Sequence, residues 1–270
     1  MSEVDIHRIA EDQIALRKRA GLSSPPSTVF PDFDLAKAYA IAAEIVRIRR
    51  KRGERTVGRK IGFTNQAIWT QYGLDTPIWA HMYEDTVNFA VRDRGSVSLA
   101  GMAAPRIEPE VVFKLRSAPS GGEEKSLLAS IEWMAVGFEI VDCHYPGWKF
   151  RPADTVVDFG LHAALVVGTP ETFAEMRDET LLRCLKEFHI VLLCEGEEMA
   201  RGKGAFVLGS PLLALKYLCD LLARQGGEPL SAGEIVTTGT LTAALPVRPG
   251  QTWTVGIEGI DLRTPSLTLT

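Results

Sequence analysis

Two apolar segments of the sequence carry carboxylates where a folded protein would normally place uncharged side chains. Glu108 and Glu110 lie within residues 105–113, and Glu139 lies within residues 137–141. Both segments have the composition of β-strands, in which side chains alternate between two faces. Glu108 and Glu110 would then project from one face, where their charges repel each other unless a cation lies between them. Either a divalent cation binds here, or the segment is an edge strand with a solvated acidic face.

Further charged residues follow the second of these segments. Asp142, Asp154 and Asp158 share that part of the chain with Lys149 and Arg151. A site built from carboxylate oxygens selects a hard cation, so the sequence predicts Mg²⁺ or Mn²⁺ and disfavours zinc. Such a cation keeps coordination positions for water and for a substrate.

Two isolated residues are further candidates for a substrate site. Lys60 stands between Gly58 and Gly62 in an apolar segment. It would either meet an anionic substrate or extend its amine to solvent from a strand end. His81 is the polar residue of the apolar segment 78–82. A single histidine of this kind is either a hydrogen-bonded core residue or a general base.

The periodicity of the sequence predicts a helical beginning followed by a β-rich remainder. Apolar residues recur at helical spacing in residues 2–21 and 34–53, and Asp34 is the expected cap of the second helix. Residues 1–80 are therefore predicted to form a mainly helical region. Residues 81–270 are predicted to form a catalytic domain that contains the sheet, with both regions packed as one unit.

Segments of β-type and helical pattern alternate irregularly along the rest of the chain. No G-x-G-x-x-G motif follows a strand, and there is neither a phosphate-binding loop nor an internal repeat. The sequence therefore predicts an α+β fold with a large mixed or antiparallel sheet. The predicted strands are 97–99, 107–115, 134–141, 163–167, 190–193, 234–240, 252–257 and 266–269, and the predicted helices are 126–133, 172–183 and 211–224.

The composition is that of an ordinary globular protein and excludes several classes of function. The 270 residues are 46% hydrophobic and 24% charged, and the net charge of −4 gives no basic surface of the kind that binds nucleic acid. We expect no membrane-spanning segment and no N-terminal signal segment. The four cysteines show neither a C-x-x-C motif nor a pairing pattern, which predicts free thiols in a cytoplasmic protein.

Six short motifs follow one another along nearly the whole chain. They are Gly58-Arg59-Lys60-Ile61-Gly62, Gly73-Leu74-Asp75-Thr76-Pro77, Arg106-Ile107-Glu108-Pro109-Glu110, Phe138-Glu139-Ile140-Val141-Asp142, Gly202-Lys203-Gly204 with Leu208-Gly209-Ser210-Pro211, and Gly233-Glu234-Ile235-Val236-Thr237-Thr238-Gly239. Each motif is weak by itself. In this order they resemble the 2-keto-4-pentenoate hydratase and 4-oxalocrotonate decarboxylase family, within the fumarylacetoacetate hydrolase superfamily.

The resemblance implies a fold, a metal site and a type of reaction. The fold is a fumarylacetoacetate-hydrolase-like mixed β-sandwich roll in which Glu108, Glu110 and Glu139 hold Mg²⁺ or Mn²⁺. A 2-oxo acid can chelate such a cation through its carboxylate and 2-oxo oxygens, which stabilises the enolate formed during the reaction. Lys60 would support the substrate carboxylate or the enolate oxygen. Thr240 would either donate to the same carboxylate or serve as a turn residue.

Three departures from the family pattern leave the reaction open. Ile78 stands where hydratases often carry an Asp, and an apolar residue there is typical of decarboxylases. Asp158, a further candidate catalytic residue, is followed by Phe159 where the family commonly has Asn. This change would either place a large apolar group in the substrate pocket or alter the turn. Thr238-Gly239-Thr240 resembles the hydrolase branch more closely than the Thr-Gly-Ala of hydratases.

The sequence therefore predicts a metal-dependent lyase of a 2-oxo or 2-hydroxydienoic acid in aromatic catabolism, of hydratase or decarboxylase type. A C–C bond hydrolase of acylpyruvates is the enzymatic alternative, and His81 or His162 in the pocket would supply its base. The chain could instead be a catalytically weak partner subunit of a hydratase–decarboxylase complex. We expect a homo-oligomer, or a complex with a related lyase, and no nucleic-acid or membrane partner.

Overall fold

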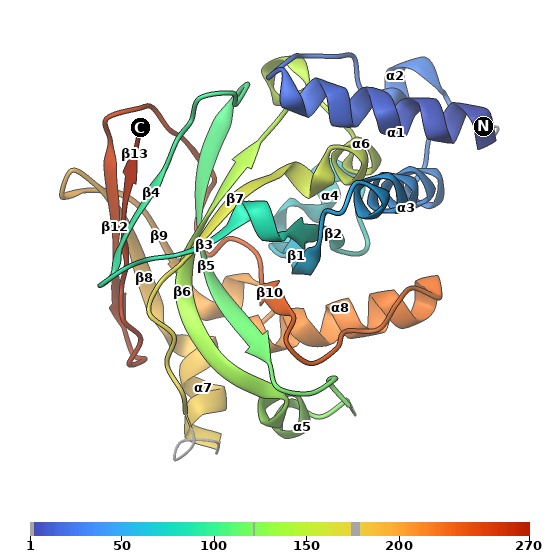
Figure 1. Cartoon of the computed structure of the whole chain (residues 1–270). Helices are drawn as coiled ribbons and strands as arrows, with labels where there is room; N and C mark the ends of the chain where they lie inside the picture. The colour runs from blue at the N-terminus through green and yellow to red at the C-terminus, as the bar shows by residue number, and fades with distance from the viewer. Residues whose placement is uncertain (1–2, 121, 174–178) are drawn as a thin grey trace.

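Two mixed β-sheets form the centre of the computed structural model, which describes residues 3–120, 122–173 and 179–270 (Figure 1). The larger sheet has eight strands, in the order β2-β1-β10-β5-β6-β7-β3 with β11 paired to β5. The smaller sheet has five strands, in the order β4-β13-β12-β8-β9. The strands are β1 Thr56–Gly62, β2 Ile78–Tyr83, β3 Val87–Phe89, β4 Arg94–Val97, β5 Pro105–Leu115, β6 Ile131–Asp142, β7 His162–Val167, β8 His189–Cys194, β9 Glu197–Lys203, β10 Ile235–Thr237, β11 Leu245–Pro246, β12 Thr252–Glu258 and β13 Ser266–Leu269.

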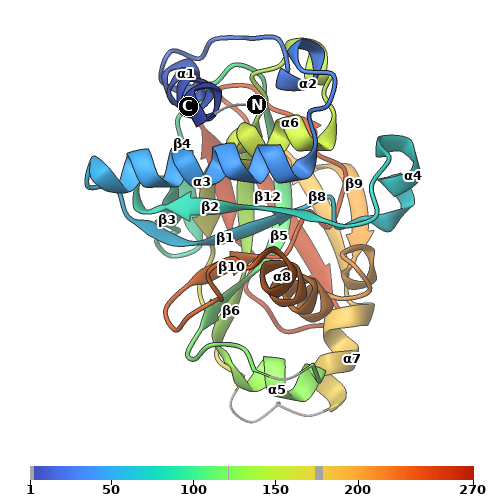
Figure 2. The same cartoon turned by 90° about the vertical axis from the view of Figure 1, so that its right-hand side faces the viewer.

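Helices lie around the two sheets (Figures 1 and 2). The α-helices are α1 Glu3–Lys18, α2 Pro26–Val29, α3 Leu35–Lys51, α4 Trp69–Tyr72, α5 Glu124–Ala129, α6 Pro152–Val157, α7 Glu179–Glu187 and α8 Pro211–Gln225. Short 3-10 helices are η1 Gln66–Ile68, η2 Glu84–Thr86, η3 Pro146–Trp148, η4 Phe159–Leu161 and η5 Gly204–Phe206.

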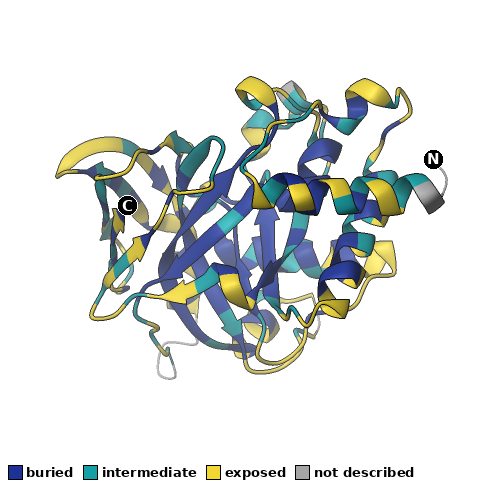
Figure 3. Ribbon diagram, turned by 45° about the horizontal axis from the view of Figure 1, so that its top comes forward, coloured by how far each residue is buried: buried dark blue, intermediate teal, exposed yellow. Residues whose placement is uncertain are grey.

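The two faces of the large sheet have different neighbours, which sets the place of the carboxylates. Ile107, Val111 and Phe113 of β5 belong to the main hydrophobic core, together with residues of β8, β12, β13 and α8. Because side chains alternate along a strand, Glu108 and Glu110 project from the opposite face. Figure 3 shows the strands of the sheet mostly buried, whereas the outer helices carry buried and exposed residues in turn. The carboxylates therefore face away from the small sheet.

Helices α1 and α3 cover the edge of the large sheet near β2 (Figure 2). Ile41, Ile45 and Ile48 of α3 recur at helical spacing and are buried against α1 and α6. The Asp34 side chain caps α3 by accepting a hydrogen bond from the backbone N–H of Lys37 at 2.9 Å. The sequence pattern thus folds into the two helices that it predicted.

The predicted α+β class is confirmed, but the predicted boundary at residue 80 falls inside β2. β1 pairs with β2 on one side and with β10 on the other, so both strands are part of the large sheet. The helical cover ends with α3 at Lys51, and the chain from residue 56 onwards contributes to the sheet.

Three further elements differ from the sequence-based expectations. The helix predicted over 126–133 ends at Ala129, because Ile131 begins the long strand β6. The helix predicted over 172–183 lies partly outside the described residues, and α7 begins at Glu179. Strand β9 was not predicted, since its polar sequence Glu197–Lys203 is mostly exposed and is held by pairing with β8.

Residues Gly204–Gln225, which include η5 and α8, are apolar and long enough to cross a membrane, contrary to the expectation that no apolar segment approaches that length. In the structure, Leu212, Leu215, Leu218 and Leu222 are buried in the main core. A buried core helix passes the same test of length and composition, so the test is weak evidence for a membrane-spanning segment.

Candidate metal centre

Three carboxylates converge on the face of the large sheet that the small sheet does not cover. Within the antiparallel β5–β6 pair, Glu108 lies directly opposite Glu139, and Glu110 lies opposite Gly137. One carboxylate oxygen of each glutamate lies within 4.8 Å of the other two. The register of a single strand pair therefore assembles the three predicted metal ligands.

Burial and charged neighbours together give the three carboxyl groups different charges. It raises the pKa of Glu108 to about 7 and raises the pKa of Glu110 well above its ordinary value, and the charge of Glu139 adds to both shifts. Burial opposes ionisation of Glu139 as well, but Lys60 and His162 hold its pKa at about 2. An ionised Glu139 thus lies beside a Glu110 that retains its proton.

Lys60 is a fixed cation beside these carboxylates. Its Nζ lies 3.2 Å from Glu139 Oε2 and donates a hydrogen bond to the Gly160 carbonyl at 3.0 Å. Burial alone would lower the pKa of Lys60, but the surrounding glutamates raise it above the ordinary value. Lys60 therefore stays an ammonium group and is unsuited to act as a base. The carbonyl that accepts its hydrogen bond belongs to Gly160, which has φ +63° and where a Cβ would lie 2.8 Å from the Cβ of Ala80.

His162 fixes the orientation of the Glu139 carboxylate. Its Nδ1 lies 2.7 Å from Glu139 Oε1, and its Nε2 lies 2.9 Å from Thr86 Oγ1. Burial lowers the pKa of His162, which favours the neutral imidazole. Since ionised Glu139 can only accept, the Nδ1–H donates the hydrogen bond to it. His162 thus holds a candidate ligand in place and is not among the described residues that line the adjoining cavity.

A tight turn after β10 holds Glu110. The backbone N–H of Gly239 donates to Glu110 Oε2 at 2.7 Å. Gly239 has φ +97°, and a Cβ there would lie 2.0 Å from Thr64 Oγ1, so only glycine fits. The next residue, Thr240, lines the cavity, but its hydroxyl donates to the Thr242 carbonyl at 3.0 Å. The structure therefore gives Thr240 a local role in the turn.

The donor set fits a divalent cation that prefers oxygen ligands. Glu110 Oε1 is buried and has no hydrogen-bond partner among the described residues, and Glu139 Oε2 is buried and forms an ion pair with Lys60 Nζ at 3.2 Å. Converging buried carboxylate oxygens of this kind are groups that a bound cation would satisfy. In the described part of the chain this cluster contains neither His nor Cys, which favours Mg²⁺ or Mn²⁺ over zinc.

Glu108 and Lys60 line a cavity of about 440 Å³, which we call the carboxylate cavity. Arg106 also lines this cavity, and its guanidinium lies 3.9 Å from the centre of the Trp148 ring. The sequence held a signal for Arg106, because it precedes Glu108 by two positions and so projects from the same face of β5. The predicted site residues that line the cavity are Lys60, Ile78, Glu108 and Thr240.

Aromatic side chains form one wall of the cavity. The Phe63 ring contacts the Tyr72 ring at 5.3 Å and the Phe150 ring at 6.4 Å between centroids. Trp148 contacts Phe150 at 6.3 Å. Rings of this kind offer flat apolar surfaces suited to a planar, conjugated substrate.

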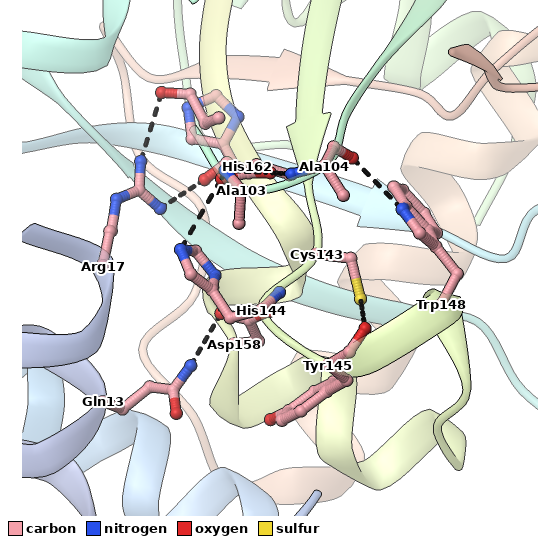
Figure 4. Close-up of polar contacts among 12 residues, drawn as sticks. Gln13, Arg17, Ala103, Ala104, Cys143, His144, Tyr145, Trp148, Asp158 and His162 are labelled. Carbon is pink, nitrogen blue, oxygen red and sulfur yellow. Dashed lines mark hydrogen bonds and ion pairs between the residues drawn. The ribbon is translucent and has the colours of Figure 1, made fainter. Parts of the chain in front are cut away.

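Asp158 is not among the described residues that line the carboxylate cavity, and its catalytic role stays a prediction. Its carboxylate accepts hydrogen bonds from Gln13 Nε2 at 2.7 Å and from the His144 backbone N–H at 3.0 Å, and lies 2.8 Å from His144 Nδ1 (Figure 4). Arg17 of α1 donates to the backbone carbonyls of His162 and Ala163 in the same region. Asp158 therefore attaches α1 to the segment between β6 and α6.

Phe159 and His81 also lie outside the described lining of the carboxylate cavity, contrary to the predicted substrate pocket. The Phe159 ring packs against the guanidinium groups of Arg17, at 4.8 Å, and Arg49, at 5.8 Å. His81 is paired in register with Arg59, so it projects from the face of the sheet opposite to the carboxylates. Neither side chain is placed to contact a substrate at the metal centre.

The chain is similar to hydratases and decarboxylases over most of its length. The 2-keto-4-pentenoate hydratase of Paraburkholderia phymatum is 32% identical over 256 residues, which cover 92% of this chain and 94% of that protein. The 4-oxalocrotonate decarboxylase of Pseudomonas sp. strain CF600 is 33% identical over 234 residues, which cover 86% and 84%. A scan against protein-family models found no match.

Solved structures show the same fold. The 4-oxalocrotonate decarboxylase from Pseudomonas putida G7, complexed with magnesium and adipate, has a TM-score of 0.90 and 28% identity, covering 100% of this chain and 99% of that chain. A fumarylpyruvate hydrolase from Pseudomonas aeruginosa has a TM-score of 0.60 and 16% identity, covering 79% and 89%, and shares the fold alone. By fold and by sequence, this chain belongs to the family of 2-keto-4-pentenoate hydratases and 4-oxalocrotonate decarboxylases.

Proposed function

We propose that this protein is a divalent-metal-dependent lyase of a 2-oxo or 2-hydroxydienoic acid in aromatic catabolism. The observation that carries the proposal is the convergence of Glu108, Glu110 and Glu139 beside Lys60, with one buried Glu110 oxygen that has no hydrogen-bond partner among the described residues. The hydratase and decarboxylase relatives and the magnesium-bound neighbour support the same type of reaction.

The residues around the carboxylates are suited to bind and orient an anionic substrate. Bound at the three glutamates, Mg²⁺ or Mn²⁺ would supply a Lewis acid for a chelating 2-oxo acid. Lys60 holds a permanent positive charge toward the substrate oxygens, and Arg106 places a second one in the same cavity. Hydrogen bonds from His162 and Gly239 fix Glu139 and Glu110 before any substrate binds, which limits reorganisation during the reaction.

Within this class, the cavity favours decarboxylation over hydration. Ile78 contributes an apolar wall where a hydratase needs a polar group to position water. Arg106 and Arg201 both line the cavity and could bind a second carboxylate at a distance from the cation site. We therefore propose an unsaturated 2-oxo dicarboxylic acid as the preferred substrate, with one carboxylate leaving as carbon dioxide.

Neither histidine predicted as the base of an acylpyruvate hydrolase is among the described residues that line the carboxylate cavity. His81 lies on the opposite face of the sheet, and His162 is engaged with Glu139 and Thr86. The homo-oligomer, the complex with a related lyase and the weakly active partner subunit stay predictions. Four free cysteines, all within the described residues, agree with the proposed cytoplasmic location.

Incubation of the purified protein and Mg²⁺ with three substrates separates the reactions. We expect carbon dioxide release from 4-oxalocrotonate, with slower or no loss of diene absorbance from 2-hydroxypentadienoate. Pyruvate and a carboxylic acid from an acylpyruvate would indicate a hydrolase. Loss of 2-hydroxypentadienoate without carbon dioxide release from 4-oxalocrotonate would assign a hydratase, and no reaction with any of the three would contradict the substrate class.

A further inference from the structure

A second cavity lies beside β2, the edge strand of the large sheet, and shares no lining residue with the carboxylate cavity. Its volume is about 760 Å³, and residues of α3, the β1–β2 pair and the end of α8 line it. Figure 2 shows β2 crossing the molecule between α3 and α8. The proposed lyase reaction leaves this cavity without a role.

Neighbouring residues on the same strands face the two cavities. On β1, Lys60 lines the carboxylate cavity and Arg59 lines the second one. On β2, Ile78 lines the first cavity, whereas Trp79 and His81 line the second. Alternation of side chains along a strand accounts for most of this division, because Arg59 and its register partner His81 project from the face opposite to Lys60. Ala80, the register partner of Lys60, is an exception and lines the second cavity.

Arg59 is a buried cation with too few hydrogen-bond acceptors. Its exposed fraction is 3%, and its Nε and Nη1 have no hydrogen-bond partner within the described residues. Glu234 Oε1 lies 3.7 Å from Nη1, which is too long for a hydrogen bond. The Glu228 carboxylate is engaged by Arg50 at 3.1 and 3.3 Å. Because a guanidinium keeps its charge, these unpaired donors are costly unless a ligand supplies acceptors.

The surroundings of Arg59 add a neutral polar group and a flat apolar surface. His81 Nε2 is buried and has no hydrogen-bond partner among the described residues. Burial and the charge of Arg59 lower the pKa of His81 to about 4, so its imidazole is neutral near pH 7 and can donate one hydrogen bond. The Trp79 ring lies 5.6 Å from the Arg59 guanidinium carbon, and the Tyr39 ring stacks on it at 5.4 Å.

We propose that this second cavity binds a small organic carboxylate with an apolar body. Arg59 Nε and Nη1 lie on different edges of one planar guanidinium, so a carboxylate can accept a charge-assisted hydrogen bond on either edge, with His81 as a further donor. The apolar body would contact Trp79 and the aliphatic part of the wall, which includes Ala42, Ala43, Ile45, Val46, Ala80 and Val156. A small inorganic anion would leave that wall without contacts.

Calorimetric titration of the magnesium-loaded full chain with 3-phenylpropionate tests this assignment. We expect saturable binding that is absent for the uncharged analogue 3-phenylpropanamide. Arg59→Gln should weaken binding by roughly tenfold or more, since hydrogen bonds between charged partners are being removed. Arg52→Gln, at an exposed arginine that pairs with Glu11 and does not line the cavity, is the matched control and should leave binding unchanged.

Two further variants locate the binding site. Glu108→Gln, in the carboxylate cavity, should leave binding of 3-phenylpropionate intact, so the result does not depend on the lyase assignment. His81→Leu should weaken binding several-fold and serves in place of Arg59→Gln if that variant does not fold. Binding that is lost in Glu108→Gln and kept in Arg59→Gln would place the probe at the metal centre and overturn the proposal.

The molar mass of the protein in solution shows whether Arg59 instead contacts a second copy of the chain. If the wild-type chain binds no 3-phenylpropionate, the proposal fails. A mass of more than one chain that falls in Arg59→Gln would then show that Arg59 meets an acidic group of a second copy.

Discussion

Glu108, Glu110 and Glu139 carry different charges although they share one site. Lys60 and His162 stabilise the ionised form of Glu139, whereas burial and the charge of Glu139 favour protonated Glu108 and Glu110. A cation that binds all three must therefore displace protons. The affinity of the site for metal is thus tied to the protonation of individual residues.

Replacing Glu108 should separate metal binding from folding. In Glu108→Gln the affinity for Mn²⁺ should fall by about a hundredfold or more, and turnover should fall with it. The thermal midpoint of the metal-free variant should be unchanged or higher, since one buried ionisable group is replaced by a neutral one of similar shape. Calorimetry and thermal unfolding measure both quantities.

Glu132→Gln is the matched control for this substitution. Glu132 lies on β6 with a side chain that is 43% exposed and forms a surface ion pair with Lys114. Its replacement should change neither metal affinity nor turnover. Equal Mn²⁺ affinity in Glu108→Gln and wild type would exclude Glu108 as a ligand.

The raised pKa values predict how metal binding depends on pH. Glu108, with a pKa of about 7, is protonated at pH 5.5 and ionised at pH 8. Affinity for Mn²⁺ should therefore rise across this interval, by up to about tenfold per pH unit for each proton released. Mn²⁺ titrations in matched buffers measure this slope, and a flat profile would contradict the protonation states given above.

The same shifts predict the stability of the metal-free protein. Because the folded pKa of Glu108 lies above its unfolded value, its contribution to stability is fully present below about pH 4.5 and is lost as the pH rises through 7. Glu139 has the opposite sign, and its contribution is lost only as the pH falls below about 4.5. Urea unfolding of the metal-free protein should therefore show lower stability at pH 8 than at pH 5.5, and added Mg²⁺ should reduce the difference.

At the scale of elements, the turn after β10 connects the sheet to the metal site. Gly239→Ala introduces a Cβ 2.0 Å from Thr64 Oγ1 at a residue with φ +97°. We expect a loss of roughly 2–4 kcal/mol of stability, from strain and overpacking together, and weaker Mn²⁺ binding because the Glu110 contact shifts.

Gly233→Ala provides the matched control for the turn. Gly233 has φ +87°, but a Cβ there would have no atom within 4 Å. Gly233→Ala should therefore lose about 1 kcal/mol of stability, because the backbone conformation is unfavourable for alanine but there is no steric clash. Its affinity for Mn²⁺ should be unchanged. Chemical unfolding measures the free energy of unfolding of both variants. Equal losses in Gly239→Ala and Gly233→Ala would show that the contact with Thr64 is unimportant.

Helix α1 is attached to the rest of the protein through contacts of Arg17. The Arg17 guanidinium donates to the carbonyls of His162 and Ala163 and packs on the Phe159 ring. Arg17→Ala should therefore lower the free energy of unfolding by about 1.5–3 kcal/mol, as measured in urea. Lys18→Ala, at the exposed neighbouring position, should stay within about 0.5 kcal/mol of wild type, and equal effects would show that α1 docks without these hydrogen bonds.

The elements that the sequence predicts well are those with strong local patterns. Carboxylates in apolar, β-branched segments predicted β5 and β6, and the cap and apolar spacing predicted α3. β9 escaped prediction because its pairing with β8, rather than its own composition, makes it a strand. The sequence pattern predicts helix for the first residues of β6 because the apolar pattern of α5 continues into them.

At the scale of the whole molecule, the path of the chain decides which predicted residues meet. The alternation rule was sufficient to group Glu108 with Glu110, and the family motifs added Glu139 and Lys60. The places of Asp158, Phe159 and His81 depend on how η4 and β2 pack against the helices, and neither periodicity nor motif spacing contains that information. Alternation implies that Arg59 and Lys60 project from opposite faces of β1, but a cavity on each face depends on how α3 and α8 pack against the sheet.

The central claim is that one cation, held by Glu108, Glu110 and Glu139, is required for lyase activity. The most direct measurement is the rate of 4-oxalocrotonate consumption by metal-stripped protein as Mn²⁺ is added. The account predicts no activity without metal and a rise that saturates at one Mn²⁺ per chain. Full activity in the metal-stripped protein, or the same titration curve for Glu110→Gln, would contradict it.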